Sequence, residues 1–389
     1  MNISPYIEWT PQHIGHLFDA RVKESRTLEY KRDMPNTRGE GLKELLADVS
    51  AFANSSGGVI VFGVDERESE PSDCVGVQIT DSVNEKLRLE QTISANLDPN
   101  LRGCRFDVIA TRNGKTILAL RIPANLNAPH MIRTGSPKFF FRGSAGKIPM
   151  DSYDIRAAFL SSEGLAQKVS CFRKRRCDAI RKGEIRLDPE ESGWTVFHIL
   201  PLSAFQRPRH FSMRELQTWA KDMRPLRSYG GWTHEISLDG YAVCSPGSAQ
   251  AGKCSYSMVF REACIEAVMP CVHTNDKGRR IIQERAVIEA LQEAIPAYLR
   301  MYAAMEVTPP FLFSLSYLGV GDAVCYIPTQ LLSYCHGLRP IATSTLLLPF
   351  YETDEGEPAP DRILTYFSDL LANASGLSSS IYFDKTARI

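Results

Sequence analysis

Three acidic residues placed at the two ends of one short segment are the first feature of this sequence that suggests chemistry. Glu24 and Glu29 precede a helical segment, and Asp65 ends the apolar run that follows it. Consecutive elements of a chain usually pack side by side, which brings such ends together. Converging carboxylates form a hard oxygen site suited to Mg²⁺ or Mn²⁺. We therefore predict that the three carboxylates lie within about 8 Å of one another and share one or two ions.

The sequence around these residues resembles the Schlafen-type AlbA_2 domain. Residues 24–31 read Glu-Ser-x-x-x-Glu-Tyr-Lys, and residues 50–65 read Ser-Ala-Phe-Ala-Asn-x-x-Gly-Gly-x-Ile-x-x-Gly-Val-Asp. The later stretch 138–144, Lys-Phe-Phe-Phe-Arg-Gly-Ser, is similar to the last strand of that domain and is followed by a closing helix. The resemblance covers roughly residues 5–162 and implies an α/β domain that engages nucleic acid. Similar domains occur in nucleases, in regulators and in proteins of unknown role.

The resemblance also assigns roles to the acidic residues. Schlafen-like endoribonucleases use an acidic triad, and Glu24, Glu29 and Asp65 match its motif residue by residue. It implies that these carboxylates hold Mg²⁺ or Mn²⁺, which polarises a phosphoryl oxygen and activates a bound water. The alternative is a set of surface carboxylates paired with nearby basic residues. Glu66 and Glu68 leave the identity of the third ligand open.

Basic residues near the acidic set are candidate phosphate contacts. Side chains alternate along a strand, so Lys31 shares a face with Glu29 and either neutralises a phosphate or forms a salt bridge with Glu29. The residues predicted to contact nucleic acid are Lys31, Arg32, Arg142, Lys147, Arg173, Lys174, Arg175 and Arg176. The last four lie in a basic connector. Its basic side chains either bind the phosphates of a nucleic-acid backbone or form the solvent-exposed face of a linking helix.

Two other kinds of site fit the sequence less well. Residues 247–254 nearly have P-loop spacing, but Cys254 replaces the Ser or Thr that binds Mg²⁺. The residues after it alternate like a strand where a P-loop requires a helix, so ATP binding is disfavoured. No Gly-x-Ser-x-Gly motif occurs, and His13 and His16 on a predicted helix are more typical of exposed side chains than of metal ligands.

Composition narrows the functional classes. A chain of 389 residues predicts two domains. Lys plus Arg and Asp plus Glu both number 45, so any electrostatic attraction for nucleic acid must be local. No Cys-x-x-Cys pair indicates zinc. The sequence shows neither a signal peptide nor an apolar stretch of membrane-spanning length, so we expect a cytoplasmic protein with free thiols and no membrane partner.

Hydrophobic periodicity divides the chain into three segments: an α/β mixed-sheet domain at 1–165, a basic linker helix at 166–186, and an α+β domain of unknown role at 187–389. The first segment predicts strands at 27–31, 59–64, 105–111, 116–122 and 138–142, and helices at 10–20, 40–53, 82–97 and 152–162. The last predicts strands near 233–237, 240–245, 255–261, 310–317, 344–348 and 380–384. Its predicted helices begin at a capping box on Ser212, near 279 with Pro296 expected to kink or end the helix, and at 361.

Two functions from different classes follow. The first is a metal-dependent endoribonuclease that acts on structured or single-stranded RNA. The alternative is a non-catalytic DNA- or RNA-binding regulator whose C-terminal domain senses a ligand or partner. The chain holds one Glu-Ser…Glu-x-Lys motif, whereas Schlafen-like enzymes resemble paired lobes around a groove. We therefore predict a homodimer, the alternative being a monomer whose C-terminal domain forms the other wall of the groove.

Overall fold

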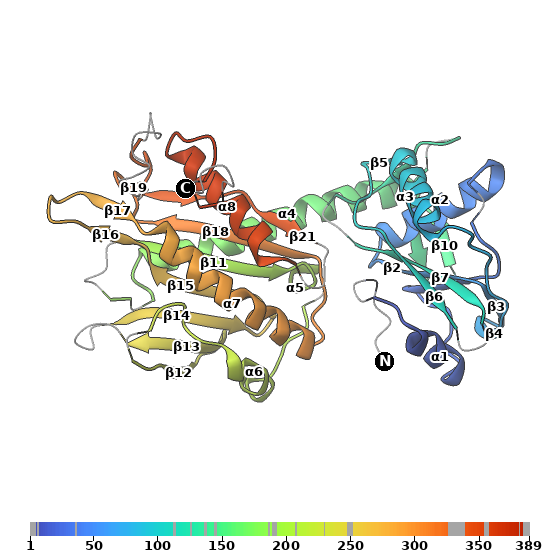
Figure 1. The fold of residues 1–389 in the computed structure, drawn as a ribbon, viewed down its shortest axis with the longest axis horizontal. Helices are drawn as coiled ribbons and strands as arrows, with labels where there is room; N and C mark the ends of the chain where they lie inside the picture. The colour runs from blue at the N-terminus through green and yellow to red at the C-terminus, as the bar shows by residue number, and fades with distance from the viewer. Residues whose placement is uncertain are drawn as a thin grey trace. The chain divides into compact units, whose positions relative to one another are not determined.

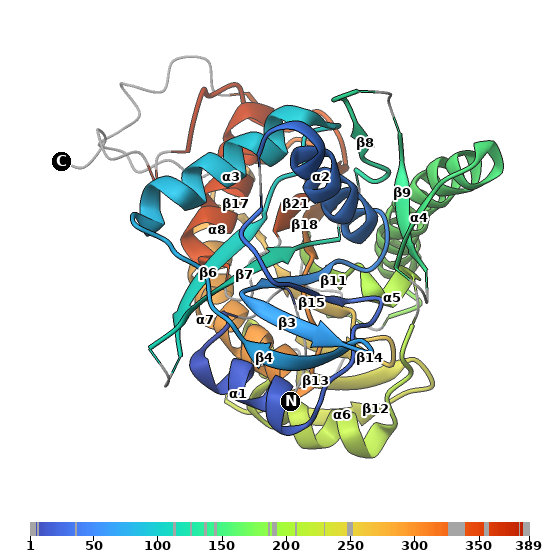
Figure 2. The same cartoon turned by 90° about the vertical axis from the view of Figure 1, so that its right-hand side faces the viewer.

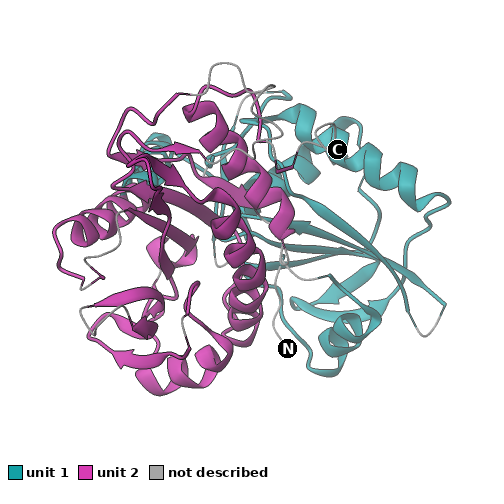
Figure 3. Ribbon diagram, turned by 60° about the vertical axis from the view of Figure 1, so that its left-hand side comes forward, with its two compact units in different colours: residues 1–167, 354–356 teal, residues 168–353, 357–389 magenta. Residues whose placement is uncertain are grey.

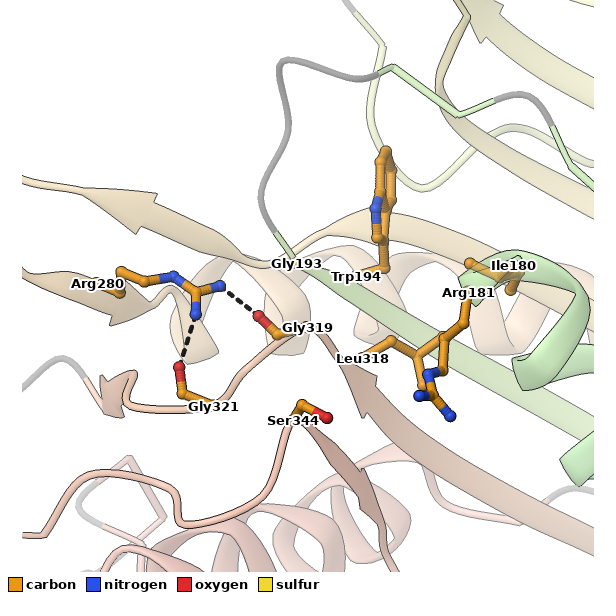
Figure 4. Close-up of a pocket in the computed structure, with 9 residues that line it drawn as sticks. All are labelled: Ile180, Arg181, Gly193, Trp194, Arg280, Leu318, Gly319, Gly321 and Ser344. Atoms are coloured by element: carbon orange, nitrogen blue, oxygen red, sulfur yellow. Dashed lines mark hydrogen bonds between the residues drawn. The ribbon is translucent and has the colours of Figure 1, made fainter. Parts of the chain in front are cut away.

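The computed structural model of the chain divides into two compact units (Figure 3). Unit 1 comprises residues 1–167 with 354–356, and unit 2 comprises residues 168–353 with 357–389. The chain passes from unit 1 to unit 2 within one helix, α4 (Ser152–Arg181). The structure describes residues 5, 8–35, 37–111, 114–124, 127–135, 138–143, 146–185, 187–188, 193–206, 208–228, 230–246, 252–325, 339–353, 358–380 and 382–383.

Unit 1 is built on a four-stranded mixed sheet with strand order β1-β2-β7-β6. Figure 2 shows its strands β6 and β7 side by side. β1 pairs with β2 in parallel, and the other pairs are antiparallel. The sheet strands are β1 (Leu28–Lys31), β2 (Gly58–Phe62), β6 (Arg105–Ala110) and β7 (Thr116–Ile122). The smaller two-stranded pairs are β3 (Val64–Arg67) with β4 (Glu70–Cys74), β5 (Leu97–Asp98) with β8 (Met131–Ile132), and β9 (Phe140–Gly143) with β10 (Gly146–Pro149). The helices wholly within this unit are α1 (Pro11–Asp19), α2 (Gly39–Ala53) and α3 (Ser82–Asn96).

Helices cover both faces of this sheet, α2 and α3 on one side and α1 on the other (Figure 1). The apolar run of β2 explains the arrangement. Ile60 and Phe62 pack into the core beneath α2 and α3, whereas Val59 and Val61 pack into the core beneath α1. Because successive side chains point to opposite faces, an unbroken apolar strand requires cover on both. The predicted α/β mixed-sheet domain is confirmed.

Local sequence signals set the element boundaries in this unit. Thr10 precedes α1 in an extended conformation, and Pro11 occupies the first turn, where its missing N–H costs nothing. The Asp81 carboxylate caps α3 by accepting hydrogen bonds from the backbone of Val83 and Asn84, both at 3.0 Å. Gly57 precedes β2 with φ +71°, and a Cβ there would lie 2.7 Å from a backbone oxygen of β7. The glycine pair of the sequence motif is therefore explained by close backbone packing.

Unit 2 is built on an antiparallel sheet with strand order β12-β13-β14-β15-β11-β18-β20, with β21 also paired to β18. Its strands are β11 (Trp194–Pro201), β12 (Thr233–Ile236), β13 (Gly240–Pro246), β14 (Lys253–Phe260), β15 (Ile265–Pro270), β18 (Phe311–Leu318), β20 (Thr345–Leu347) and β21 (Tyr351–Thr353). A second sheet contains β16 (Val272–Thr274), β17 (Arg280–Ile282) and β19 (Val324–Cys325). The helices are α5 (Ser203–Gln206), α6 (Met213–Trp219), the 3₁₀ helix η1 (Ala220–Asp222), α7 (Glu284–Ala304) and α8 (Pro360–Ala374).

The large sheet of unit 2 also has helices on both faces (Figure 1). α7 and α8 pack on one face, where Tyr298 and Phe367 join the core formed by Phe197 and Phe313. The C-terminal half of α4 packs on the other face, where the Phe172 ring meets strand β14 edge-on. The α+β class predicted for this part of the chain is confirmed.

Several predicted boundaries are wrong. The helix expected to end at 162 continues to Arg181 as one helix of 30 residues, because inward-facing Leu165 and Val169 keep its helical spacing. α7 continues through Pro296 to Ala304. Strands β11 and β15 were not predicted, although both lie within the large sheet. Residues 382–383 form a turn where a strand was expected.

Most of the P-loop-like stretch 247–254 lies outside the described residues. Its last two residues belong to strand β14 and do not begin a helix. The nine cysteines that the structure describes are all free thiols. Among the described helices, none combines the length and the apolar character needed to cross a membrane.

Candidate nucleic-acid interface in unit 1

Strand β1 sends its apolar and charged side chains to opposite faces. Leu28 and Tyr30 are buried in the core beneath α1. Glu29 and Lys31 lie on the other face, where α2 packs, and form an ion pair with Lys31 Nζ 3.1 Å from Glu29 Oε1. The alternation of a strand therefore brings the two charged residues together, as the sequence predicts.

Lys31 is the centre of a network of charges between β1, α2 and the β9–β10 pair. Its Nζ lies 3.1 Å from Glu44 Oε1 and 3.5 Å from Asp48 Oδ2, both on α2. Lys147 on β10 reaches the other oxygen of Asp48 at 2.8 Å, and Arg142 on β9 pairs with Glu29. We call this set the Lys31 network; it comprises Glu29, Lys31, Glu44, Asp48, Arg142 and Lys147.

Asp48 is the member of this network that sequence analysis missed. Its side chain is only 2% exposed and lies on the inward face of α2, between the buried Leu45 and Phe52. A carboxylate on an apolar helix stripe is a signal of a buried ion pair, since unpaired burial of a charge is costly. Here Lys31 and Lys147 supply the pairing.

Burial and charge compete within the Lys31 network. Burial raises the pKa of Asp48, and the two neighbouring lysines offset only part of that effect. Burial alone would lower the pKa of Lys31, but Asp48 and Glu29 outweigh it and hold that pKa above its usual range. The hydrogen bond from Lys31 lowers the pKa of Glu44. Lys31 is therefore a permanently charged group.

Glu24 lies beside the network in a half-buried position. Its Oε1 accepts a hydrogen bond from the backbone N–H of Tyr30 at 2.8 Å. Burial raises the pKa of the Glu24 carboxyl, and the nearby charges of Glu29 and Glu66 raise it further. Glu24 and Glu29 thus act on each other electrostatically, but each has its own hydrogen-bonding partner.

Asp65, which ends the apolar run in the sequence, lies in the strand that follows β2. Gly63 has φ +96° and separates β2 from β3, and Asp65 belongs to β3. Its carboxylate pairs with Arg32 Nη1 at 3.0 Å. The charge of Glu66, also on β3, raises the pKa of Glu24. The structure therefore places Asp65 in an ion pair with Arg32, and Glu66 near enough to Glu24 to repel its charge.

The predicted shared metal site is not assembled in this structure. The described part of the chain contains no group of three acidic, histidine or cysteine side chains placed to hold a metal ion. Glu29 is held by Arg142 and Lys31, and Asp65 is held by Arg32. Basic side chains thus already neutralise carboxylates that Mg²⁺ or Mn²⁺ would need as ligands. These residues do not fit the ion expected from the sequence.

Arg142 anchors Glu29 and is not exposed to solvent. Its side chain is 3% exposed, and its guanidinium donates to Glu29 and to the carbonyl of Ser25, the latter at 2.9 Å. The same guanidinium lies 4.5 Å from the ring centre of Phe52. The prediction that Arg142 contacts phosphate is therefore wrong for this arrangement, because protein groups surround its charge.

The basic connector does not form a continuous charged surface either. Arg173 donates to the carbonyl of Leu348 at 2.6 Å, and Arg176 donates two hydrogen bonds to the buried Glu266, at 3.0 and 2.7 Å. The two basic residues between them, at positions 174 and 175, are exposed. The prediction that these residues contact phosphates is wrong for Arg173 and Arg176, because the helix places both side chains on the face that packs against the rest of unit 2.

A cavity of about 260 Å³ opens beside the Lys31 network. Met34, Leu45 and Phe62 are the large apolar residues of its wall. Its charged lining residues are Lys31, Arg32, Asp33, Glu44 and Asp48. The cavity thus combines apolar surface with two consecutive basic residues. Its volume is just below the roughly 300–1,000 Å³ of typical small-molecule sites.

Comparison with known families concerns this same region. Residues 24–151 match the family model described as Schlafen, AlbA_2. Unit 1 contains a Schlafen AlbA_2 domain. The matched range includes every residue of the Lys31 network and every residue that lines the cavity. No family model matches the remainder of the chain. No curated protein matches the chain.

Two solved structures that match the chain each cover a little over one third of it. The DIP2311 protein from Corynebacterium diphtheriae is 15% identical over 36% of this chain and 29% of its own, with a TM-score of 0.26. The N-terminal domain of a Nitrosomonas europaea protein, described as related to the ATP-dependent DNA helicase RecG, is 24% identical over 37% of this chain and 91% of its own, with a TM-score of 0.25. Less than one third of the Corynebacterium protein is therefore matched.

Proposed function

We propose that the AlbA_2 domain binds nucleic acid at the mouth of the cavity beside Lys31, with RNA or single-stranded nucleic acid as the preferred ligand. One observation carries this proposal. Lys31 and Arg32 line a cavity with apolar walls, and their surface partners Glu44 and Asp65 are exposed carboxylates. The family match supports a nucleic-acid-related role for the domain.

Giving up the exposed partners of these two cations, Asp65 for Arg32 and Glu44 for Lys31, costs little, and Lys31 keeps its pairs with Glu29 and the buried Asp48. Arg32 and Asp65 are 60% and 39% exposed, and exposed ion pairs contribute only about 0–1 kcal/mol. Glu44 is 58% exposed as well. A phosphate offers the same cations a charge-assisted hydrogen bond and releases counterions on binding. The Lys147–Asp48 pair involves a buried carboxylate and is expected to stay intact.

The apolar part of the cavity suits an unpaired base. Met34 and Pro35 are half-buried and offer apolar surface to the flat face of a base, while Lys31 and Arg32 lie where the attached phosphate would be. Bases in a duplex are stacked and cannot enter such a cavity. We therefore expect single strands, loops or bulges to bind more tightly than a continuous duplex.

Replacing Arg32 with alanine tests the proposal. We expect the affinity for a single-stranded RNA to fall about 5- to 10-fold, and the slope of log affinity against log salt to decrease by about one. Fluorescence anisotropy with a labelled oligonucleotide at several salt concentrations measures both quantities. Arg133→Ala is the matched control, since Arg133 is also a half-exposed arginine of unit 1 in an exposed ion pair, with Asp98. Equal binding by both variants would contradict the proposed site.

Cleavage of the bound RNA is a second candidate function, favoured by Glu24. A half-buried carboxyl whose pKa is raised by burial and by neighbouring carboxylates is the kind of group that transfers protons in active sites. Glu24 belongs to the motif on which the resemblance to endoribonucleases rests. The predicted alternative, a regulator that binds without cleaving, requires no such group.

A cleavage assay separates the two functions. If the protein is a nuclease, Glu24→Gln keeps an acceptor for the Tyr30 N–H but removes the ionisable group, and we expect a rate loss on the order of 100-fold with RNA binding retained. Glu29→Gln is less suitable because it leaves the buried Arg142 without its carboxylate. Parallel reactions with Mg²⁺, with Mn²⁺ and with EDTA test the predicted metal dependence. Wild-type protein that binds RNA but cleaves it under none of these conditions would identify a binding module.

A further inference from the structure

The first half of helix α4 exposes an apolar face. Tyr153 and Leu160 are 77% and 61% exposed, which is unusual for large apolar side chains on a helix. Ala157 and Gly164 lie on the same face, with Ala157 exposed and open space where a Cβ of Gly164 would point. These four residues, which we call the α4 outer face, follow one another at spacings of four, three and four.

The α4 outer face points away from the unit to which this half of the helix belongs. Leu165 is the buried residue of this half of α4, and Phe159 packs edge-on against Phe139 of unit 1. At 100° per residue, the direction of the outer face differs from that of Leu165 by about 110°. The helix therefore already has an inward side, and the outer face has no role in packing within its own unit.

We propose that the α4 outer face is the contact between two copies of this chain, with the two helices antiparallel. The spacing of four and three is that of a helix seam in which side chains of one helix fit between those of another. A second copy of the chain fits this face because the face is complementary to itself, both in side-chain size and in charge. This assigns an interface to the homodimer predicted from the sequence.

Side-chain size is complementary only in the antiparallel arrangement. With the two-fold axis midway between Ala157 and Leu160, Tyr153 lies opposite Gly164 of the second copy, and Leu160 lies opposite Ala157 of the second copy. Each large side chain then meets a small one, and symmetry repeats both contacts. A parallel pair would place Tyr153 against Tyr153 and Gly164 against Gly164, which leaves crowding in one layer and a void in another.

Charge is complementary in the same register. Arg156 and Glu163 flank the outer face on one side, and both are exposed. Neither has an ion-pair partner among the residues that the structure describes. The antiparallel register places Arg156 beside Glu163 of the second copy, and symmetry places Glu163 beside Arg156 of the second copy. Two equivalent ion pairs thus border the apolar layers, as in antiparallel helix pairs.

Charge reversal of these two residues tests the proposal in the full chain. Sedimentation velocity from low to high micromolar concentration measures the dimer dissociation constant. We expect Arg156→Glu and Glu163→Arg each to weaken the dimer at least about 10-fold, because each places two like-charge pairs at the interface. The double variant Arg156→Glu/Glu163→Arg restores both pairs with reversed sign and should recover the wild-type dissociation constant. A dimer that tolerates both single variants would overturn the proposal, as would a wild type that is monomeric at every concentration.

A second substitution keeps the test independent of folding. Gly164→Leu favours the helix in the isolated chain, since glycine is a poor helix former, but it fills the space opposite Tyr153 of the second copy. We expect this variant to be folded by circular dichroism and monomeric by sedimentation. The matched control is Leu87→Glu, which changes another exposed apolar residue of unit 1, on α3, that is 50% exposed. This control should leave the dimer unchanged; loss of the dimer in Leu87→Glu, or its retention in Gly164→Leu, would place the interface elsewhere.

Discussion

Glu266→Ala is expected to lower the free energy of unfolding of unit 2 by about 3–5 kcal/mol. The Glu266 carboxylate is completely buried between α4 and the large sheet. It accepts hydrogen bonds from Arg176, the shorter at 2.7 Å, and from the Tyr256 hydroxyl at 2.7 Å, and it lies 3.0 Å from His198 Nε2. Removing the carboxylate leaves the largely buried guanidinium of Arg176 without its counter-charge, which is the costly half of breaking a buried pair.

The pKa of Glu266 gives the same prediction a pH dependence. Burial would raise this pKa, but hydrogen bonds from His198 and Arg176 outweigh it and lower the pKa to about 2. Because the folded-state pKa lies below the unfolded value, the stabilisation is fully present above the unfolded pKa of about 4.5 and is lost as pH falls toward 2. The Glu266→Ala variant should therefore lose less stability on acidification than the wild type.

Urea denaturation followed by tryptophan fluorescence provides the measurement. Trp194, Trp219 and Trp232 all belong to unit 2, so the signal reports mainly on this unit. Glu235→Ala is the matched control: Glu235 also pairs with a basic residue of the same sheet, but it is 48% exposed and should cost at most about 1 kcal/mol. The added change Arg176→Met should recover part of the loss, because it removes the unpaired charge. Equal destabilisation by Glu266→Ala and Glu235→Ala would contradict this account.

Unit 2 is also expected to lose about 3 kcal/mol of stability between pH 4.5 and pH 7 through Glu284. Glu284 begins α7 with a side chain that is 4% exposed. Burial raises its pKa to about 7, and hydroxyls of Ser368 and Ser380 lower it by a smaller amount. The folded state therefore favours the neutral carboxyl. Its contribution is fully present below the unfolded pKa of about 4.5 and disappears as pH rises through 7.

Glu284→Gln isolates this effect because the amide is nearly isosteric and does not titrate. We expect the variant to be more stable than the wild type at pH 8, by up to about 3 kcal/mol, and to differ little from it at pH 4. Denaturation curves of both proteins at the two pH values give the comparison. Glu289→Gln, on the same helix but 62% exposed, should change stability little at either pH. A stability difference for Glu284→Gln that is independent of pH would show that the carboxyl titrates normally.

Local patterns in the sequence determined many of the elements around the candidate site. The run of apolar residues in β2, with no polar residue between them, required helices on both faces of this strand. The helical spacing of Leu45 and Phe52 required α2 to bury one apolar face. The alternation of β1 placed Glu29 and Lys31 on a common face. These features depend on residues close together in the chain, so periodicity alone predicts them.

Tertiary structure decided which charges meet. Arg142 on β9 and Glu29 on β1 are more than one hundred residues apart in the sequence. No local pattern can therefore show that this arginine neutralises this glutamate. Asp48 was hidden for the same reason, because its lysine partners come from β1 and β10. The acidic motif was recognisable from the sequence, but whether its carboxylates face a metal, a phosphate or the protein's own cations depends on long-range pairing. The sequence therefore determined the fold class and the AlbA_2 domain. Only the tertiary structure decided that basic side chains pair with the acidic residues of the motif. The physical reason is that electrostatic interactions depend on distance in space and not on separation along the chain.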